Sequence, residues 1–443
     1  MGMYRFDSPG MVLLTLAGGD TMDIHIDWRA EGQPGTGYSG RLDVLQRGSK
    51  LASMVFVGTL PSSGTMSVTD HMAIEVPSEP VARAGPAPTS GQPEPSDEAL
   101  LARRRETRSR SAAAGDRAEY VVSYATNRKR IYPEDVSKGY SSERASSVDY
   151  GSCRVFIPKS HKIGSIGSRW WKRLLTMSDD RLRLLGISAT SAEDHWKQIR
   201  DRLAAFAAEE RDALVFVHGY NVSFEEAALR AAQIGFDLQV KGAMAFFSWP
   251  SQGTLDGYLA DAATIEASEG AIADYLSDFA MQSGARMVHV IAHSMGNRAV
   301  LRAVNRIAAA AHKRSGIRFG QFILAAADVD ADTFRSLSTA YTRLAQRTTL
   351  YVSERDRAVE ASRWLHHFPR AGLIPPVLVL PEIDTINVTN ADLTMLGHGY
   401  VAAARDVLTD MHALIRHGHP PQDRFGLREA RTETDEQYWL IGG

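Results

Sequence analysis

The chain has 443 residues, more than one ordinary domain holds, so we expect two or three structural units. Its 50 Lys and Arg residues nearly balance its 52 Asp and Glu residues, for a formal charge of −2. Because neither sign dominates, this composition argues against a nucleic-acid-binding protein. The single cysteine, Cys153, excludes an intrachain disulfide and a thiolate-rich metal cluster.

Two further patterns bear on localisation. No run of about 18 apolar residues occurs, so no transmembrane helix is expected. Residues 1–7 lack the basic start and apolar centre of a signal peptide. We therefore expect a cytoplasmic protein, although a leader that is removed during secretion would leave no trace in this sequence.

The first unit is predicted over residues 1–78. Apolar and polar side chains alternate along residues 22–28, as in a half-buried strand, and short apolar runs follow at 42–45, 54–57 and 72–76. Glycine-rich turns separate these runs, which predicts a small all-β domain. Its role is not encoded in a motif. Contact with a second copy of the chain, a polymer or a surface is the hypothesis for it.

A flexible linker is predicted over residues 79–117, because six of the eighteen prolines lie between Pro77 and Pro95 and a run of arginines follows. From residue 118 to 425 short apolar strands alternate with helices. This pattern predicts an α/β domain with a mostly parallel sheet and helices on both faces. Residues 426–443 are predicted to be a C-terminal tail.

The most informative segment runs from the strand at 288–291 into a helix through Ala292-His293-Ser294-Met295-Gly296. A serine placed between a strand and a helix, with small residues two positions before and after it, is the arrangement of a nucleophile elbow. Small neighbours are needed because the turn is tight and strained. Ser294 is therefore the predicted nucleophile.

An oxyanion hole for this serine needs two backbone amides. The first is predicted to be that of Met295, directly after the nucleophile. The second is expected from the loop after the strand at 214–217, at Tyr220 or Asn221, because Gly219 lets the chain turn sharply there. His218 precedes the nucleophile in the chain, so we interpret it as a residue that braces this loop.

The base and the acid are expected downstream, in the order Ser, Asp or Glu, His. His398 is the predicted base, because it lies in a glycine-flanked loop between the last strand and the last helix. Asp356 follows the strand at 348–352, where a carboxylate can fix the histidine tautomer. Asp328 and Asp330, after the preceding strand, are the alternatives for the acid.

These residues resemble a bacterial, esterase/lipase-like branch of the α/β-hydrolase superfamily whose members are mostly uncharacterised. The likeness covers roughly residues 118–418. The matching motifs are Ala125-Thr126-Asn127-Arg128, Tyr150-Gly151 with Val155 and Ile157-Pro158, Val217-His218-Gly219-Tyr220-Asn221, Phe247-Ser248-Trp249-Pro250-Ser251, Tyr258-Leu259-Ala260-Asp261, Ala292-His293-Ser294-Met295-Gly296-Asn297, Asp328-Val329-Asp330, Tyr351-Val352-Ser353 with Asp356, and Gly397-His398-Gly399-Tyr400. The resemblance implies the Ser294, Asp356 and His398 assignment, and it leaves the substrate open.

The sequence thus predicts a carboxylic ester hydrolase that works through an acyl-enzyme, without a metal or an organic cofactor. Its partner is expected to be a small-molecule ester, with Trp249 and Tyr258 as candidate substrate contacts against the alternative of loop packing. Lipase, thioesterase, acyltransferase and peptidase chemistry on the same site stay open. A binding or scaffold protein on a hydrolase frame is the alternative from another class.

Overall fold

A computed structural model describes the side chains of residues 119–159, 161, 181–253, 257–310, 316–354, 368–388 and 405–441. It also gives the backbone of 117–118, 401–404 and seven strands between residues 4 and 75. The chain divides into two units, Met1–Leu100 and Leu101–Gly443. The predicted linker, residues 79–117, lies outside the described residues except for Arg117.

The first unit consists of antiparallel strands, which confirms the predicted all-β domain. A five-stranded sheet has the order β2 (Gly10–Thr15), β3 (Thr21–Asp27), β5 (Gly37–Gln46), β6 (Ser49–Thr59) and β7 (Met72–Glu75). A separate ribbon pairs β1 (Tyr4–Asp7) with β4 (Arg29–Gly32).

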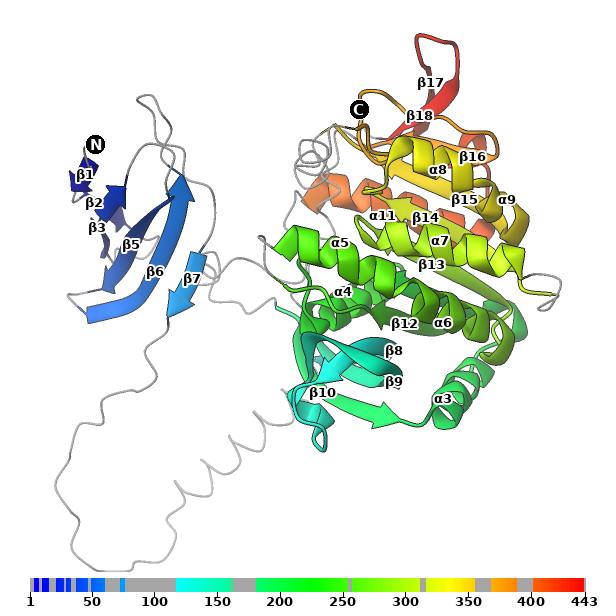
Figure 1. Ribbon diagram of the computed structural model, residues 1–443, viewed down its shortest axis with the longest axis horizontal. Helices are drawn as coiled ribbons and strands as arrows, with labels where there is room; N and C mark the ends of the chain where they lie inside the picture. Colours follow the sequence, from blue (N-terminus) through cyan, green and yellow to red (C-terminus); the bar gives the residue numbers. More distant parts are fainter. Residues whose placement is uncertain are drawn as a thin grey trace, which may run out of the picture. The chain divides into compact units, whose positions relative to one another are not determined.

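The second unit is built on an eleven-stranded sheet (Figure 1). Its strands, in spatial order, are β10 (Arg183–Thr190), β9 (Tyr140–Pro158), β8 (Arg117–Arg130), β12 (Ala243–Ser248), β11 (Asp212–Val217), β13 (Met287–His293), β14 (Phe319–Ala325), β15 (Ala345–Val352), β16 (Ile383–Asn387), β18 (Gln437–Ile441) and β17 (Leu427–Arg431). The strands from β8 to β18 run parallel, and antiparallel strands lie at both edges.

Helices cover both faces of this sheet (Figure 1). On one face lie α3 (Ala192–Ala204), α5 (Tyr258–Ala267), α6 (Glu269–Gln282), α7 (Gly296–Ala309), α8 (Ala331–Leu337) and α9 (Thr339–Leu344). On the other lie α4 (Phe224–Asp237) and α11 (Val401–His417). Alternate residues of β11 enter opposite cores: Val215 packs with the first group, and Leu214 and Phe216 with the second. The predicted α/β class is confirmed.

Local chemistry explains where several helices begin. The Ser223 hydroxyl accepts the Glu226 amide, while the Glu226 carboxylate accepts the Ser223 amide, a reciprocal cap that starts α4. The Ser191 hydroxyl caps α3 by accepting the Asp194 amide at 3.1 Å. Such caps fix the ends of the loops that carry the site.

Residues assigned to a tail by the sequence form a hairpin instead. β18 pairs with β16 through Ile386 and Trp439, and β17 then forms the edge of the sheet. Ile441 is only 3% exposed and belongs to the second core. Burial of this apolar end explains why the sheet continues beyond residue 426.

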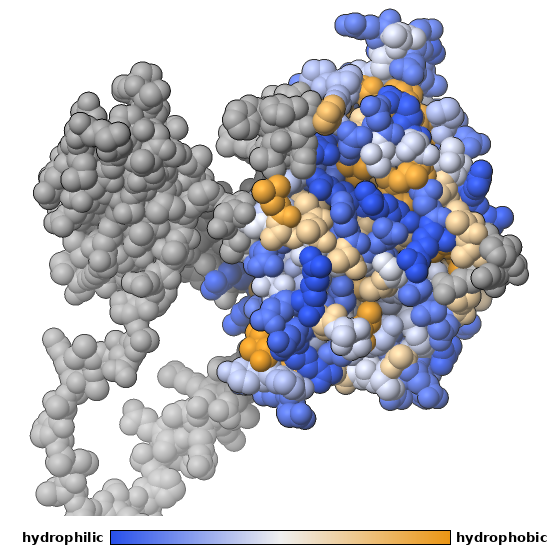
Figure 2. Space-filling view, viewed as in Figure 1, coloured by the Kyte–Doolittle hydropathy of each residue, from blue (hydrophilic) through white to orange (hydrophobic). Residues whose placement is uncertain are grey.

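The surface of the second unit is mostly hydrophilic on the face in Figure 2, with apolar residues in small separate groups. Isolated exposed apolar residues of this kind are normal for globular proteins. Within the described parts of the chain, no helix combines the length and the apolarity needed to cross a membrane.

Candidate active site

Ser294 occupies a strained turn between β13 and α7. Its φ is +49°, in the left-handed region that residues with a side chain rarely adopt. The turn is held from both sides, because the Ser294 amide donates to the Ala325 carbonyl at 2.9 Å and its carbonyl accepts the Asp328 amide at 3.2 Å. The predicted strand–serine–helix geometry is therefore present, and neighbouring strand β14 maintains it.

The small neighbours of Ser294 are required by close packing. A Cβ on Gly296 would lie 2.5 Å from the His218 carbonyl oxygen, so no larger residue fits there without a shift. Ala292 is completely buried, and its methyl group is accommodated. Alanine at this position thus satisfies the size requirement that glycine meets in the usual motif.

Asn297 is a bracing residue that sequence reasoning did not assign. Its side-chain amide, completely buried, lies within hydrogen-bond distance of the carbonyls of Ala292, Ser294 and Ala325, at 3.1–3.2 Å. Three carbonyls from β13, the elbow and β14 thus share one donor group. Its only signal in the sequence is its place directly after Gly296 in the motif.

The loop after β11 lies directly against the nucleophile. A Cβ on Gly219 would be 2.9 Å from the Cβ of Ser294, so this loop approaches the serine at the one residue that lacks a side chain. The Asn221 amide donates to the Asp261 carboxylate at 3.2 Å, and Asn221 has a φ of +56°. Asn221 therefore shapes the turn, and its amide is already engaged.

His218 braces this loop through its ring and its backbone carbonyl. Its ring stacks on Trp249 with centroids 5.0 Å apart, and the Trp249 indole N–H donates to the His218 carbonyl at 2.9 Å. The Nδ1 of His218 lies 2.7 Å from the Gly219 carbonyl, which assigns the proton to Nδ1. Burial, and then the charge of Arg128, hold the pKa of His218 well below its usual value. A neutral, doubly engaged imidazole serves structure here.

Trp249 itself is completely buried. His218 and the core cover the indole, so the ring has no accessible surface for the substrate contact that was predicted for it. Its observed place corresponds to the packing alternative.

Arg128 organises the loops around His218, another role that sequence reasoning did not assign. The guanidinium is 2% exposed and donates to the Ser248 hydroxyl at 2.9 Å, the Ser251 carbonyl at 3.0 Å and the Val222 carbonyl at 2.7 Å. The Ser248 hydroxyl in turn lies 3.3 Å from Nε2 of His218. Burial lowers the pKa of Arg128 to about 9, so it remains charged at neutral pH.

Tyr258 lies beside the loop after β11. Its ring is 5.4 Å from the ring of Tyr220, and the two rings are inclined at 73°. Its hydroxyl donates to Asp328 at 2.7 Å. The substrate contact expected for Tyr258 stays a prediction.

The two alternative acids both have partners among the described residues. Asp328 is 1% exposed and accepts Arg298 at 2.9 Å, while Arg298 also donates to the Asp328 backbone carbonyl at 2.7 Å. Asp330 caps α8 by accepting the Thr333 amide at 2.9 Å. Neither carboxylate is oriented by a histidine among the residues that the structure describes.

Asp356 and His398 lie outside the described residues, in 355–367 and 389–400. Asp356 follows β15, and His398 follows β16. Since β13, β14, β15 and β16 are parallel neighbours, both residues follow strands that end at the same edge of the sheet as Ser294.

His293 is the histidine nearest to Ser294 in the chain. Burial, and then the charge of Arg230, lower the pKa of His293 to about 3. It therefore stays neutral at physiological pH. Over the described residues, no cluster of three His, Cys, Asp or Glu side chains has the grouping of a metal site.

Three comparisons place the chain among known proteins. No curated protein matches it. Solved structures similar to it include esterase Est22, with 10% identity, a TM-score of 0.29, and coverage of 72% of this chain and 88% of that one. The structure of Est22 with p-nitrophenol has 11% identity and a TM-score of 0.30, and the match covers 73% of this chain and 90% of that one. A predicted CIB-like hydrolase from Thermoplasma acidophilum has 14% identity and a TM-score of 0.26, and the match covers 48% of this chain and 89% of that one. At such identities and TM-scores nothing is transferred from these structures.

The decisive match is to a family. The profile described as "Alpha/beta hydrolase of unknown function (DUF900)" matches residues 192–417, from the start of α3 to the end of α11. This range holds the elbow, the loop after β11 and the predicted acid and base. The chain belongs to this alpha/beta hydrolase family of unknown function.

Proposed function

We propose that this protein is a serine hydrolase that cleaves carboxylic esters through an acyl-enzyme. The observation that carries the proposal is the φ of +49° at Ser294, in a turn packed against Gly219. A backbone conformation of this kind costs of order 1–3 kcal/mol. A serine that merely capped a helix would gain nothing from it, whereas a nucleophile gains exposure of its hydroxyl to a substrate.

The proposed chemistry uses three side chains and two amides. His398 removes the proton of the Ser294 hydroxyl as that oxygen attacks the ester carbonyl, and Asp356 orients the imidazole and stabilises its charged form. The amides of Met295 and Tyr220 stabilise the oxyanion, aided by the positive end of α7, which begins at Gly296. The alcohol leaves with the proton from His398, and water then cleaves the acyl-enzyme.

The same site could transfer the acyl group to another acceptor or act on a thioester, a lipid ester or a peptide. The alternative of a scaffold protein is disfavoured by the dedicated bracing of the site. Asn297, Arg128 and His218 hold the elbow and the oxyanion loop through buried hydrogen bonds. A non-catalytic frame has no need of that network around a strained serine.

Labelling by a fluorophosphonate tests the proposal directly. We expect the full-length protein to be labelled on Ser294, because the probe reacts with a serine that a base activates. Mass spectrometry of the labelled peptide identifies the residue. Ser294→Ala should not be labelled, and Ser336→Ala, an exposed serine of α8, should be labelled like the original. An unlabelled original protein would favour the scaffold alternative.

Gly219→Ala tests the oxyanion loop. The added methyl group would lie 2.9 Å from the Cβ of Ser294 and 3.0 Å from Nδ1 of His293, so the loop must move away. Loss of one oxyanion donor typically lowers kcat by about 10²–10³-fold, and we expect a loss of this size for p-nitrophenyl butyrate. Gly270→Ala, where the nearest atom is 3.7 Å away, is the matched control and should retain full activity. Unchanged kcat in Gly219→Ala would exclude the loop from the site.

A further inference from the structure

A cavity lies beside Asp330, one of the two alternative acids. It has a volume of about 690 Å³ and is lined by parts of three segments: residues 330–335, 369–378 and 431–438. This volume is in the range of small-molecule binding sites. None of the residues placed at the nucleophile or the oxyanion loop lines it. The hairpin of β17 and β18, which the sequence did not predict, supplies one wall.

Arg370 is the buried charge of this cavity. Its backbone is fixed, because it pairs with Asp330 and the flanking Ala371 amide donates to Val329 at 2.9 Å. The side chain is 5% exposed, and its Nε lies 3.5 Å from Asp328 without forming a hydrogen bond. Within the described parts of the chain, no hydrogen bond from this guanidinium is found. Nε is completely buried, whereas the terminal nitrogens are not. The terminal nitrogens are therefore the atoms of Arg370 that can reach the cavity.

The nearby carboxylate does not satisfy Arg370. Asp328 makes its close contacts with Arg298, at 2.9 Å, and with the Tyr258 hydroxyl, at 2.7 Å. One buried carboxylate therefore faces two guanidinium groups. Burial is the main cause of a lowered pKa for Arg370, and the charges of Asp328 and Asp330 offset part of this effect. An anion in the cavity would supply the hydrogen bonds that this guanidinium lacks.

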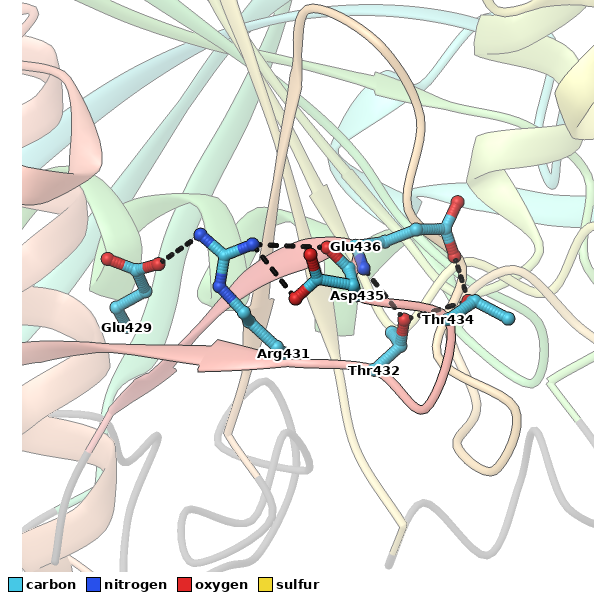
Figure 3. Close-up of polar contacts among 6 residues, drawn as sticks. All are labelled: Glu429, Arg431, Thr432, Thr434, Asp435 and Glu436. Carbon is cyan, nitrogen blue, oxygen red and sulfur yellow. Dashed lines mark hydrogen bonds and ion pairs between the residues drawn. The ribbon is translucent and has the colours of Figure 1, made fainter.

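The other arginines of the cavity are already paired. Figure 3 shows Arg431 between Glu429, at 3.0 Å, and Asp435, at 3.1 Å. Arg335 is paired with Asp332 at 2.7 Å. Arg370 is therefore the arginine whose donors are available to a ligand. A second donor is at hand, because Tyr438 of β18 lines the cavity and its hydroxyl makes no hydrogen bond among the described residues.

The remaining walls define the rest of the ligand. Pro375, Pro376, Val377 and Leu378 form an apolar wall, which suits a hydrocarbon body. Four acidic side chains, Asp330, Asp332, Glu433 and Glu436, also line the cavity and would repel phosphate, with its two charges, more strongly than an anion with a single charge. A planar carboxylate with a single charge matches the fork of a guanidinium.

We propose that this cavity binds a small monocarboxylate with an apolar body, held by the terminal nitrogens of Arg370 and the hydroxyl of Tyr438. The site requires no hydrolysis, so its test is independent of the function proposed for Ser294.

Calorimetric titration of the full-length protein with benzoate tests the proposal, with benzamide as the neutral probe of the same shape. We expect benzoate to bind at least about tenfold more tightly than benzamide, since hydrogen bonds to a charged group contribute about 1.5–3 kcal/mol. Arg370→Gln should abolish benzoate binding. Tyr438→Phe, which preserves packing, should weaken it by about tenfold. Arg335→Gln should leave it unchanged.

Three results would overturn the assignment. These are no heat from benzoate, equal affinity for benzoate and benzamide, or unchanged benzoate affinity in Tyr438→Phe. If Arg370→Gln does not fold, Tyr438→Phe and the benzamide comparison decide by themselves.

Discussion

Ser294→Ala is expected to lower kcat for p-nitrophenyl butyrate by about 10⁵–10⁶-fold, because only the oxyanion hole and substrate binding would remain to accelerate the reaction. The hydroxyl is the atom that forms the acyl-enzyme, and nothing else near it can replace that bond. Steady-state hydrolysis, corrected for the rate in buffer, measures the loss.

We expect the Ser294→Ala protein to fold with nearly unchanged stability. Ser294 is held by its backbone amide and carbonyl, which alanine retains, so the melting temperature should shift by no more than a few degrees. Ser336→Ala supplies the matched control for expression and handling. A Ser294→Ala protein that keeps more than a tenth of the original kcat would show that another residue carries the chemistry.

Asp356→Asn and Asp328→Asn are expected to separate catalysis from stability. In Asp356→Asn the imidazole loses the carboxylate that fixes its tautomer, and kcat should fall by about 10⁴-fold with little change in stability. In Asp328→Asn the buried Arg298 and Arg370 lose their shared carboxylate, at 2.9 and 3.5 Å. Breaking a buried ion pair costs about 3–5 kcal/mol of unfolding free energy.

Measuring kcat per folded molecule together with urea denaturation distinguishes the two effects. The assignment predicts that Asp328→Asn lowers the urea midpoint far more than it lowers kcat. A 10⁴-fold loss of kcat in Asp328→Asn at unchanged stability would instead identify Asp328 as the acid. The comparison is informative because both residues follow adjacent strands, β14 and β15.

Much of the frame could be predicted from local patterns. The apolar strands and the helices between them are visible in the sequence, because each strand buries both faces and each helix buries one. The elbow could also be predicted, since its requirement for small residues acts within five positions of the chain. Asp356 and His398, which rest on the order of chain segments, stay predictions.

Apart from His218, the residues that support the site could not be predicted from the sequence. Arg128 meets Ser248 across 120 residues and Val222 across 94, and Asn221 meets Asp261 across 40. Such partners have no fixed spacing, because the folding of separate strands onto one sheet brings them together. For the same reason the sequence could not show that Trp249 lies beneath His218.

The sequence by itself thus determined the alternation of strands and helices, the elbow around Ser294 and the sharp turn at Gly219, since these depend on residue size and short-range backbone geometry. The tertiary structure alone decided that Asn297 and Arg128 hold the elbow and the loop after β11, that residues 427–441 extend the sheet, and that Arg370 lines a cavity. Burial and electrostatics depend on which distant groups become neighbours, and only the folded chain establishes that.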